Sequence, residues 1–175
     1  MAGDPLALQT EALVLVSAGL GALGAPHAVY GFGNTDPARC VLQRIKGFDA
    51  PWDVAARKRL GGLRAAGASR LGAYVRHATT LLQRRAEPRK LLLLLSDGHP
   101  EDRDGYRGAR GERDTAHAVA EARRRGLTVH CTSLDPRTEA DRYLTAIFGR
   151  GHYLRVPRPE RLPEQLTNAV FARVP

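Results

Sequence analysis

The stretch Leu91-Leu92-Leu93-Leu94-Leu95-Ser96-Asp97-Gly98 is the segment that decides the fold class. Five consecutive leucines, bounded by Pro88 and by Asp97-Gly98, are typical of a strand that is buried on both faces of a parallel sheet. The flanking patterns alternate between helical and strand spacing. They predict a helix over 70–85, then a helix over 114–125, a strand over 127–132, a helix over 136–148, a strand over 152–156 and a helix over 161–172. This alternation predicts an α/β fold with a doubly wound, mostly parallel sheet and helices on both faces.

The first third of the chain adds elements to the same domain. A helix is expected over 6–23, where Gly24 ends it, although residues 12–16 also fit a strand. Strands are expected over 27–33 and 40–48, joined by the turn residues Asn34-Thr35-Asp36-Pro37, and a helix over 52–63. No internal repeat or low-complexity linker interrupts the chain, so we expect one domain over residues 1–175.

Length and composition exclude several classes of protein. The chain has 175 residues, of which 43% are hydrophobic and 26% charged, as in an ordinary soluble protein. We expect no membrane-spanning segment, because no apolar run approaches the roughly 18–20 residues needed, and no secretory signal. Two cysteines, Cys40 and Cys131, are too few for a disulfide scaffold and lack metal-ligand spacing. A reduced, cytoplasmic protein is therefore expected.

The chain is strongly basic, with 27 Lys and Arg against 18 Asp and Glu and a net charge of +9. A basic surface favours acidic partners. Only three of the basic residues are lysines, so a GC-rich coding sequence is an alternative source of the arginines. The basic residues are not interleaved with aromatic ones, as they are in single-strand binders. A nucleic-acid-binding α/β domain therefore remains a minor alternative.

Candidate ligands lie where strands are expected to end, because ligands of such folds bind at the carboxyl ends of the strands. Asp97 follows the leucine strand, and Ser69 opens the helix before it. A carboxylate and a hydroxyl are oxygen ligands of the kind Mg²⁺ requires. The alternatives are an ordinary Asp-Gly turn and a helix N-cap at Ser69. Four further side chains could face a partner at this edge: His99, Asp102, Asp104 and Asp135, the last also a candidate N-cap for the helix that begins at Pro136.

No enzyme motif is present in the sequence. It contains neither a Gly-x-Ser-x-Gly elbow nor a Gly-x-x-x-x-Gly-Lys phosphate loop. Gly19–Gly24 matches a dinucleotide fingerprint only superficially, because it falls at the end of a helix rather than between a strand and a helix. We therefore expect a binding module without catalytic activity. A Mg²⁺-dependent hydrolase using Asp97 is the weakest alternative, since no nucleophile or base is placed beside that residue.

At this point the sequence resembles a known family. Ser96-Asp97-Gly98 after an apolar strand, with Ser69-Arg70-Leu71-Gly72 opening the preceding helix, is similar to a von Willebrand factor A domain. A closer resemblance is to bacterial activation adaptors of the NorD type (nitric oxide reductase) and CbbO type (rubisco). The segments that carry it run in order along nearly the whole chain: 30–32, 45–52, 76–78, 100–104, 112–115, 118–124, 134–136, 143–144, 147–150 and 161–166.

The resemblance implies a metal-ion-dependent adhesion site. In the family an Asp-x-Ser-x-Ser motif, a Thr and a later Asp bind one Mg²⁺, and a carboxylate of the partner protein completes the coordination. Ser69 falls at the Thr position and Asp97 at the later Asp position. The resemblance also implies two partners: a client enzyme complex that presents an acidic side chain, and a MoxR-type AAA+ ATPase that remodels this client.

The chain departs from the family at its start. The Asp-x-Ser-x-Ser motif is absent, because Met1–Pro5 stand where it should already have ended. The first, central strand of the family fold is thus expected to be missing, as in an N-terminally truncated domain. Unpaired strand edges invite pairing with another chain, so we expect poor stability or self-association. A degenerate interaction domain that binds no metal is the main alternative function.

Overall fold

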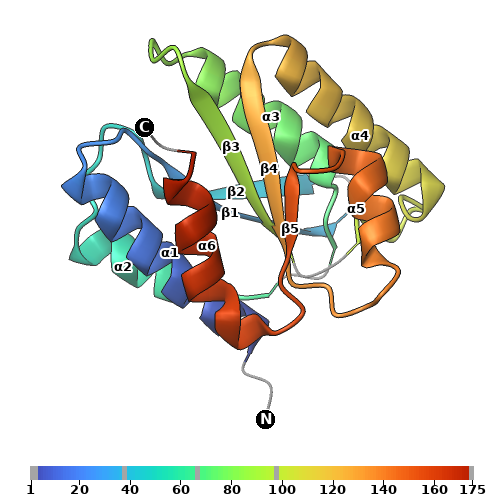
Figure 1. The fold of residues 1–175 in the computed structure, drawn as a ribbon, viewed down its shortest axis with the longest axis horizontal. Coiled ribbons are helices and arrows are strands. Elements are labelled where there is room, and N and C mark those ends of the chain that lie inside the picture. Colours follow the sequence, from blue (N-terminus) through green and yellow to red (C-terminus); the bar gives the residue numbers. More distant parts are fainter. Residues whose placement is uncertain (1–3, 37–38, 66–67, 97–98, 174–175) are drawn as a thin grey trace. The chain divides into compact units, whose positions relative to one another are not determined.

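The leucine stretch forms strand β3 (Lys90–Ser96) in a computed structural model that describes residues 4–36, 39–65, 68–96 and 99–173 (Figure 1). Strand β3 pairs in parallel with β4 (Leu127–Ser133), in a register that runs from Lys90 opposite Leu127 to Ser96 opposite Ser133. Strand β4 also pairs in parallel with the short β5 (Tyr153–Arg155). The parallel pairing expected from the sequence is therefore confirmed for this three-stranded sheet.

Strand β3 lies at the edge of that sheet, whose order is β3-β4-β5. Of its five leucines only Leu94 is buried, and the others are half-buried. The expectation that this strand is buried on both faces is therefore wrong, because most of its leucines are only half-buried. Strand β4 has that character instead, because it is the central strand and six of its seven residues are buried.

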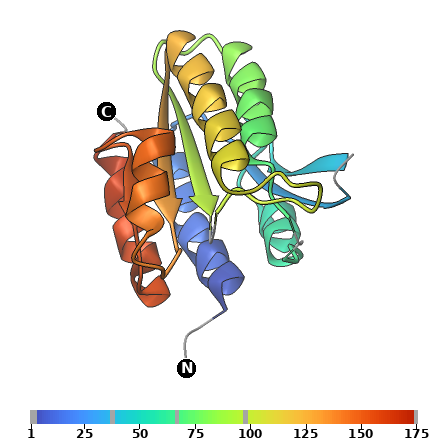
Figure 2. The same cartoon turned by 90° about the vertical axis from the view of Figure 1, so that its right-hand side faces the viewer.

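Three helices accompany the sheet in one layer: α3 (Leu71–Gln83), α4 (Ala109–Arg124) and α5 (Ala140–Phe148) (Figure 2). Helix α4 packs between the other two. Its small buried residues Ala118 and Ala122 let the helices approach closely, and Phe148 of α5 is also fully buried in this core. Together these elements make a mixed α/β unit with a parallel sheet.

The chain divides into two compact units. One contains residues 33–40 and 67–157, with the sheet and the three helices described above. The other contains residues 1–32, 41–66 and 158–175. Its elements are α1 (Pro5–Ala22), the first half of strand β1 (Val29–Asp36), most of strand β2 (Arg39–Lys46), α2 (Val54–Gly61), the 3₁₀ turn η1 (Pro159–Arg161) and α6 (Leu162–Phe171).

Helix packing and a small apolar core hold the second unit together. Helix α1 packs against α6, where a Cβ atom on Gly19 would lie 2.5 Å from the Phe171 ring. A small core of Val29, Ile45 and Leu60 joins β1, β2 and α2. Strands β1 and β2 pair with each other, as the sequence predicts.

Helix α1 corrects the expectation that no segment could span a membrane. Its 18 residues have a mean hydropathy of 1.3, and 17% of them are buried. By length and composition alone it could cross a bilayer, because its apolar residues continue all round the helix and Glu11 is its one charged residue. The core helix of a soluble protein meets the same criteria, and α1 does contribute Ala12 and Val16 to the interior.

Three local assignments also differ from the sequence prediction. Helix α3 begins after Arg70 without a side-chain cap, so Ser69 is not its N-cap. Helix α5 begins at Ala140 and not at Pro136, so Asp135 does not cap it. Asn34 belongs to β1 rather than to a turn, because its backbone exchanges two hydrogen bonds with Ala68.

Candidate functional site

The residues predicted to bind ligands lie around the carboxyl ends of β3 and β4. The carbonyl of Ser96, the last residue of β3, accepts a hydrogen bond from the Leu134 amide at 2.8 Å, which ties the two strand ends together. Asp97, the predicted metal ligand, lies outside the described residues, as does Gly98. The described part of the site consists of residues on either side of positions 97 and 98.

The backbone of Ser69 pairs with that of Glu101, which follows positions 97 and 98 in the sequence. Its amide donates to the Glu101 carbonyl at 2.8 Å, and the Glu101 amide donates back to the Ser69 carbonyl at 3.2 Å. These bonds hold Ser69 beside Glu101, which follows Asp97 by four residues in the sequence. The Ser69 Oγ atom is buried and has no hydrogen-bond partner among the described residues. A buried hydroxyl without a partner is costly, which makes the Ser69 Oγ atom a candidate contact for a ligand. Other buried polar atoms of the described residues, such as Thr132 Oγ1, are unpartnered in the same way.

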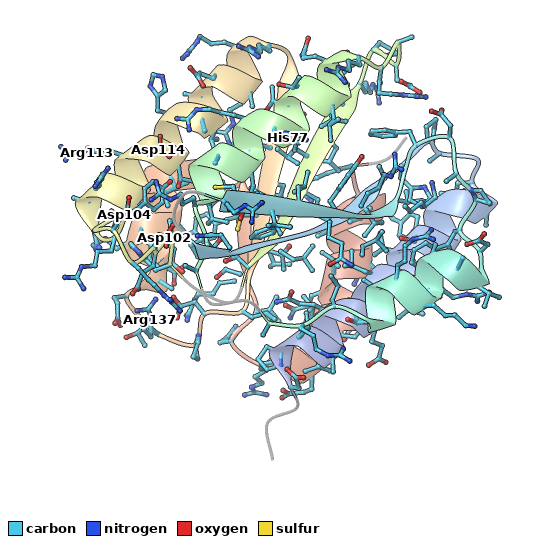
Figure 3. All side chains as sticks on the ribbon, turned by 180° about the vertical axis from the view of Figure 1, so that it is seen from behind. His77, Asp102, Asp104, Arg113, Asp114 and Arg137 are labelled. Carbon is cyan, nitrogen blue, oxygen red and sulfur yellow. The ribbon has the colours of Figure 1, made fainter. Side chains whose placement is uncertain are left out.

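Arg70 connects the start of α3 to the acidic loop before α4. Its Nε donates to Asp102 Oδ2 at 2.6 Å, while its Nη2 forms an ion pair with Asp104. Its guanidinium also lies over the Tyr106 ring, 5.2 Å from the centroid, which adds a cation–π contact. Asp102 and Asp104 lie near one end of α3 and α4 (Figure 3). This loop is thus fixed from within the unit.

Asp102 is the buried member of the network, with a side chain only 1% exposed. Its carboxylate accepts from Asn34 Nδ2 at 2.8 Å and from the Arg103 amide at 2.7 Å, in addition to Arg70. Burial alone would raise the pKa of Asp102, but these three hydrogen bonds outweigh it and lower the pKa below its usual value. A partner could reach this carboxylate only by breaking internal bonds. Asp104 is 39% exposed and offers a freer oxygen.

His99 forms a second cluster with the start of α4. Its Nε2 lies 2.9 Å from Glu112 Oε1, and Arg142 donates to the same oxygen at 3.0 Å. The imidazole packs edge-on against the Tyr143 ring at a centroid distance of 4.6 Å. Burial raises the pKa of Glu112, but the bonds from His99 and Arg142 prevail and lower it. His99 is therefore held inside the unit, with 14% of its side chain exposed.

Asp135 follows β4 and is also occupied from within. Its carboxylate accepts from the Arg137 guanidinium at 2.6 Å and from the Tyr143 hydroxyl at 2.8 Å. Burial opposes ionisation, but these bonds and the Arg137 amide lower the pKa of Asp135 to about 2. The bonds from Arg137 to Asp135 join residues that precede the first helical residue, Ala140.

Several site residues were missed by sequence reasoning. Asn34 and Tyr106 are contributed by distant segments, and the Tyr106 hydroxyl donates to Asp114 Oδ2 at 2.6 Å. Arg76 also binds Asp114, at 2.6 Å, from the facing helix α3. One feature of the sequence relates to this cluster: position 72, one turn before Arg76, is a glycine. A side chain there would collide with the Asp114 carboxylate, which packs against the Gly72 backbone.

The arrangement fits a metal ion only in part. The unpartnered Ser69 hydroxyl is an oxygen donor of the right kind, whereas Asp97 lies outside the described residues. No group of three or more His, Cys, Asp or Glu side chains able to hold a metal ion occurs within residues 4–36, 39–65, 68–96 and 99–173. The nearby carboxylates Asp102 and Asp104 already bind Arg70.

Comparison with known proteins relates the chain to a segment of longer bacterial proteins. It is 39% identical over 151 residues to protein NorD of Stutzerimonas stutzeri, covering 86% of this chain and 24% of that protein. It is 40% identical over 156 residues (89% of this chain and 25% of the relative) to an uncharacterized protein of Pseudomonas aeruginosa. NorD of Brucella melitensis is 34% identical over 161 residues, which cover 92% of this chain and 25% of that protein.

No family model matches the chain. The chain spans about a quarter of the length of the relatives it matches. Most of its residues are therefore similar to one segment of NorD proteins, in agreement with the resemblance noted in the sequence.

Proposed function

We propose that this chain is a non-enzymatic binding module of the von Willebrand factor A type, which holds a client protein through a bridging Mg²⁺ ion. Ser69 and Asp97 would bind the ion, and a carboxylate of the client would complete its coordination. The observation that carries the proposal is the buried Ser69 hydroxyl, which has no partner among the described residues and lies on a segment paired with Glu101, four residues after Asp97 in the sequence. When bound, Mg²⁺ supplies a strong and directional contact between two acidic groups that would otherwise repel each other.

The surrounding residues would position the Ser69 hydroxyl. Arg70 lies next in sequence and is clamped by Asp102 and Asp104, while the Ser69 backbone is paired with Glu101. Little conformational freedom would then remain to be lost on binding, which favours affinity. The basic surface would attract an acidic client.

The similarity to NorD proteins supports a role as an accessory to an enzyme complex. We propose that the client is a complex of the nitric oxide reductase or rubisco activation type, that a MoxR-type AAA+ ATPase remodels it, and that the module acts in the cytoplasm.

A pull-down of the client complex in buffered Mg²⁺, with and without EDTA, tests this function. We expect EDTA, Ser69→Ala and Asp97→Ala each to reduce capture at least about tenfold. The matched control is Ser69→Thr, which keeps an oxygen ligand and should retain capture. Equal capture with EDTA and without it would refute the metal bridge.

A metal-independent interaction domain is the second candidate function. It is favoured by the internal bonding of Asp102 and Asp135, whose carboxylates already bind Arg70 and Arg137. In that case capture would survive EDTA and would depend on exposed charges such as Asp104.

A further inference from the structure

We propose that a hollow between the end of β2, the turn after it and helix α2 is a docking site for an acidic peptide segment of a partner protein. This Arg44–Arg59 hollow lies within the unit that contains α1, α2 and α6. It is independent of the metal site proposed above, which belongs to the other unit. The proposal stands whether or not Mg²⁺ is bound.

The hollow has a volume of about 570 Å³. Charged and aromatic side chains share its wall: Tyr30, Arg44, Phe48, Asp49 and Arg59. The turn belongs to the segment 45–52, which carries part of the resemblance noted in the sequence but has no role in the metal site. The site therefore combines cationic groups with apolar ring surface.

Both arginines of the hollow lack a carboxylate partner among the described residues. Arg59 Nε donates to the Ile45 carbonyl at 2.7 Å, which fixes the side chain against the wall and leaves its terminal nitrogens available. The side chain of Arg44 is exposed and makes no hydrogen bond or ion pair with the described residues. Two guanidinium groups that line the same hollow are thus open to an incoming anion.

This situation contrasts with that of several arginines in the other unit. There, Arg70, Arg76, Arg137 and Arg142 each bind an acidic side chain. The segment 41–65, however, carries six basic residues and only two acidic ones. One of the two, Asp53, is used to cap α2 by accepting from the Ala56 amide at 2.8 Å. The positive charge around the hollow is therefore not neutralised by this segment.

The chemistry of the wall favours a carboxylate-bearing peptide. Guanidinium groups bind carboxylates in a bidentate fork, and such bonds gain strength when they are partly desolvated. Tyr30 and Phe48 offer apolar area for the stems of the acidic side chains. Asp49 adds one negative charge to the wall, which opposes the dense charge of a nucleic-acid backbone.

Fluorescence anisotropy with fluorescein-labelled hexaglutamate tests the proposal on the full chain, in EDTA to remove any metal contribution. The double variant Arg44→Gln/Arg59→Gln should weaken binding about tenfold, because two charge-assisted contacts are lost. The matched control Arg57→Gln/Lys58→Gln removes the same charge from α2 without altering the wall, and should change binding less than about twofold. Hexaglutamine should not bind.

Equal weakening in both double variants would overturn the proposal, since it would indicate diffuse attraction. Tighter binding of an oligothymidylate probe than of hexaglutamate, with the same dependence on the two arginines, would also overturn it. If loss of the bond from Arg59 to the Ile45 carbonyl destabilises the chain, the single variant Arg44→Gln is used instead. It should weaken hexaglutamate binding about threefold. Ser69→Ala should leave this binding unchanged, so failure of the metal site and failure of this site are distinguishable.

Discussion

Replacing Asp102 tests whether the clamp beside Ser69 is structural. Its carboxylate is 1% exposed and accepts from Arg70, Asn34 and the Arg103 amide. Asp102→Ala would remove the acceptor that these three donors share, and Asn34, which is 2% exposed, would be left without it in the interior. Breaking a buried ion pair in this way costs about 3–5 kcal/mol.

The magnitude should fall at the lower end of that range. Arg70 is 19% exposed and keeps Asp104 as a second carboxylate, so we expect a loss of about 3 kcal/mol in the free energy of unfolding. The matched variant Asp104→Ala removes a carboxylate that is 39% exposed, and should cost no more than about 1 kcal/mol. In a chain of this size these losses correspond to a fall in Tm of about 6–12 °C and of at most about 4 °C, respectively.

Urea denaturation followed by far-UV circular dichroism at pH 7 measures both losses. The pH dependence gives a second readout: because the pKa of Asp102 is lowered in the folded state, its contribution is present above its unfolded pKa of about 3.9 and is lost as the pH falls further. The difference between wild type and Asp102→Asn should therefore shrink below about pH 4. Equal losses for Asp102→Ala and Asp104→Ala would refute the reasoning.

Four further predictions concern other parts of the chain. Asp135→Asn should remove up to about 2 kcal/mol of stability at pH 7, because a folded pKa of about 2 gives a contribution that is present above about pH 4 and lost toward pH 2; a pH series of melts that is identical to wild type would contradict this. Gly72→Ala should cost about 1–3 kcal/mol by forcing apart α3 and the Asp114 carboxylate, as urea denaturation would show. Burial raises the pKa of the Cys131 thiol to about 12, so a thiol reagent should modify exposed Cys40 rapidly and Cys131 only on unfolding; two equally fast thiols in the folded chain would be inconsistent with this. Because β3 is an edge strand rich in half-buried leucines, the isolated chain should self-associate in size-exclusion chromatography or melt broadly, and a sharply melting monomer would count against that expectation.

Elements with a strong local pattern were predictable from the sequence. The leucine run became β3, and the alternating residues from Leu127 became β4 in the expected parallel pair. The apolar period from Leu6 gave α1 with nearly the predicted ends. In each case neighbouring residues alone carry the signal.

The errors arise where distant residues decide local structure. Ser69 reads as a helix N-cap, but its backbone pairs with Glu101, which local spacing cannot reveal. Asp135 before Pro136 has the pattern of a cap, yet Arg137 and Tyr143 take its carboxylate.

The contacts of the acidic loop are also decided by residues that are distant in the sequence. Asp102 and Asp104 are predicted as partner contacts because they are charged and follow a strand. In the folded unit Arg70 binds both carboxylates and Asn34 binds Asp102, and these contacts join residues that are far apart in the sequence.

Isothermal titration of MgCl₂ into the full chain tests the central claim most directly, because it needs no client. The account predicts a saturable heat for wild type and Ser69→Thr, and none for Ser69→Ala or Asp97→Ala. A heat that is unchanged in Ser69→Ala, or the absence of any Mg²⁺-dependent heat in the wild type, would contradict it.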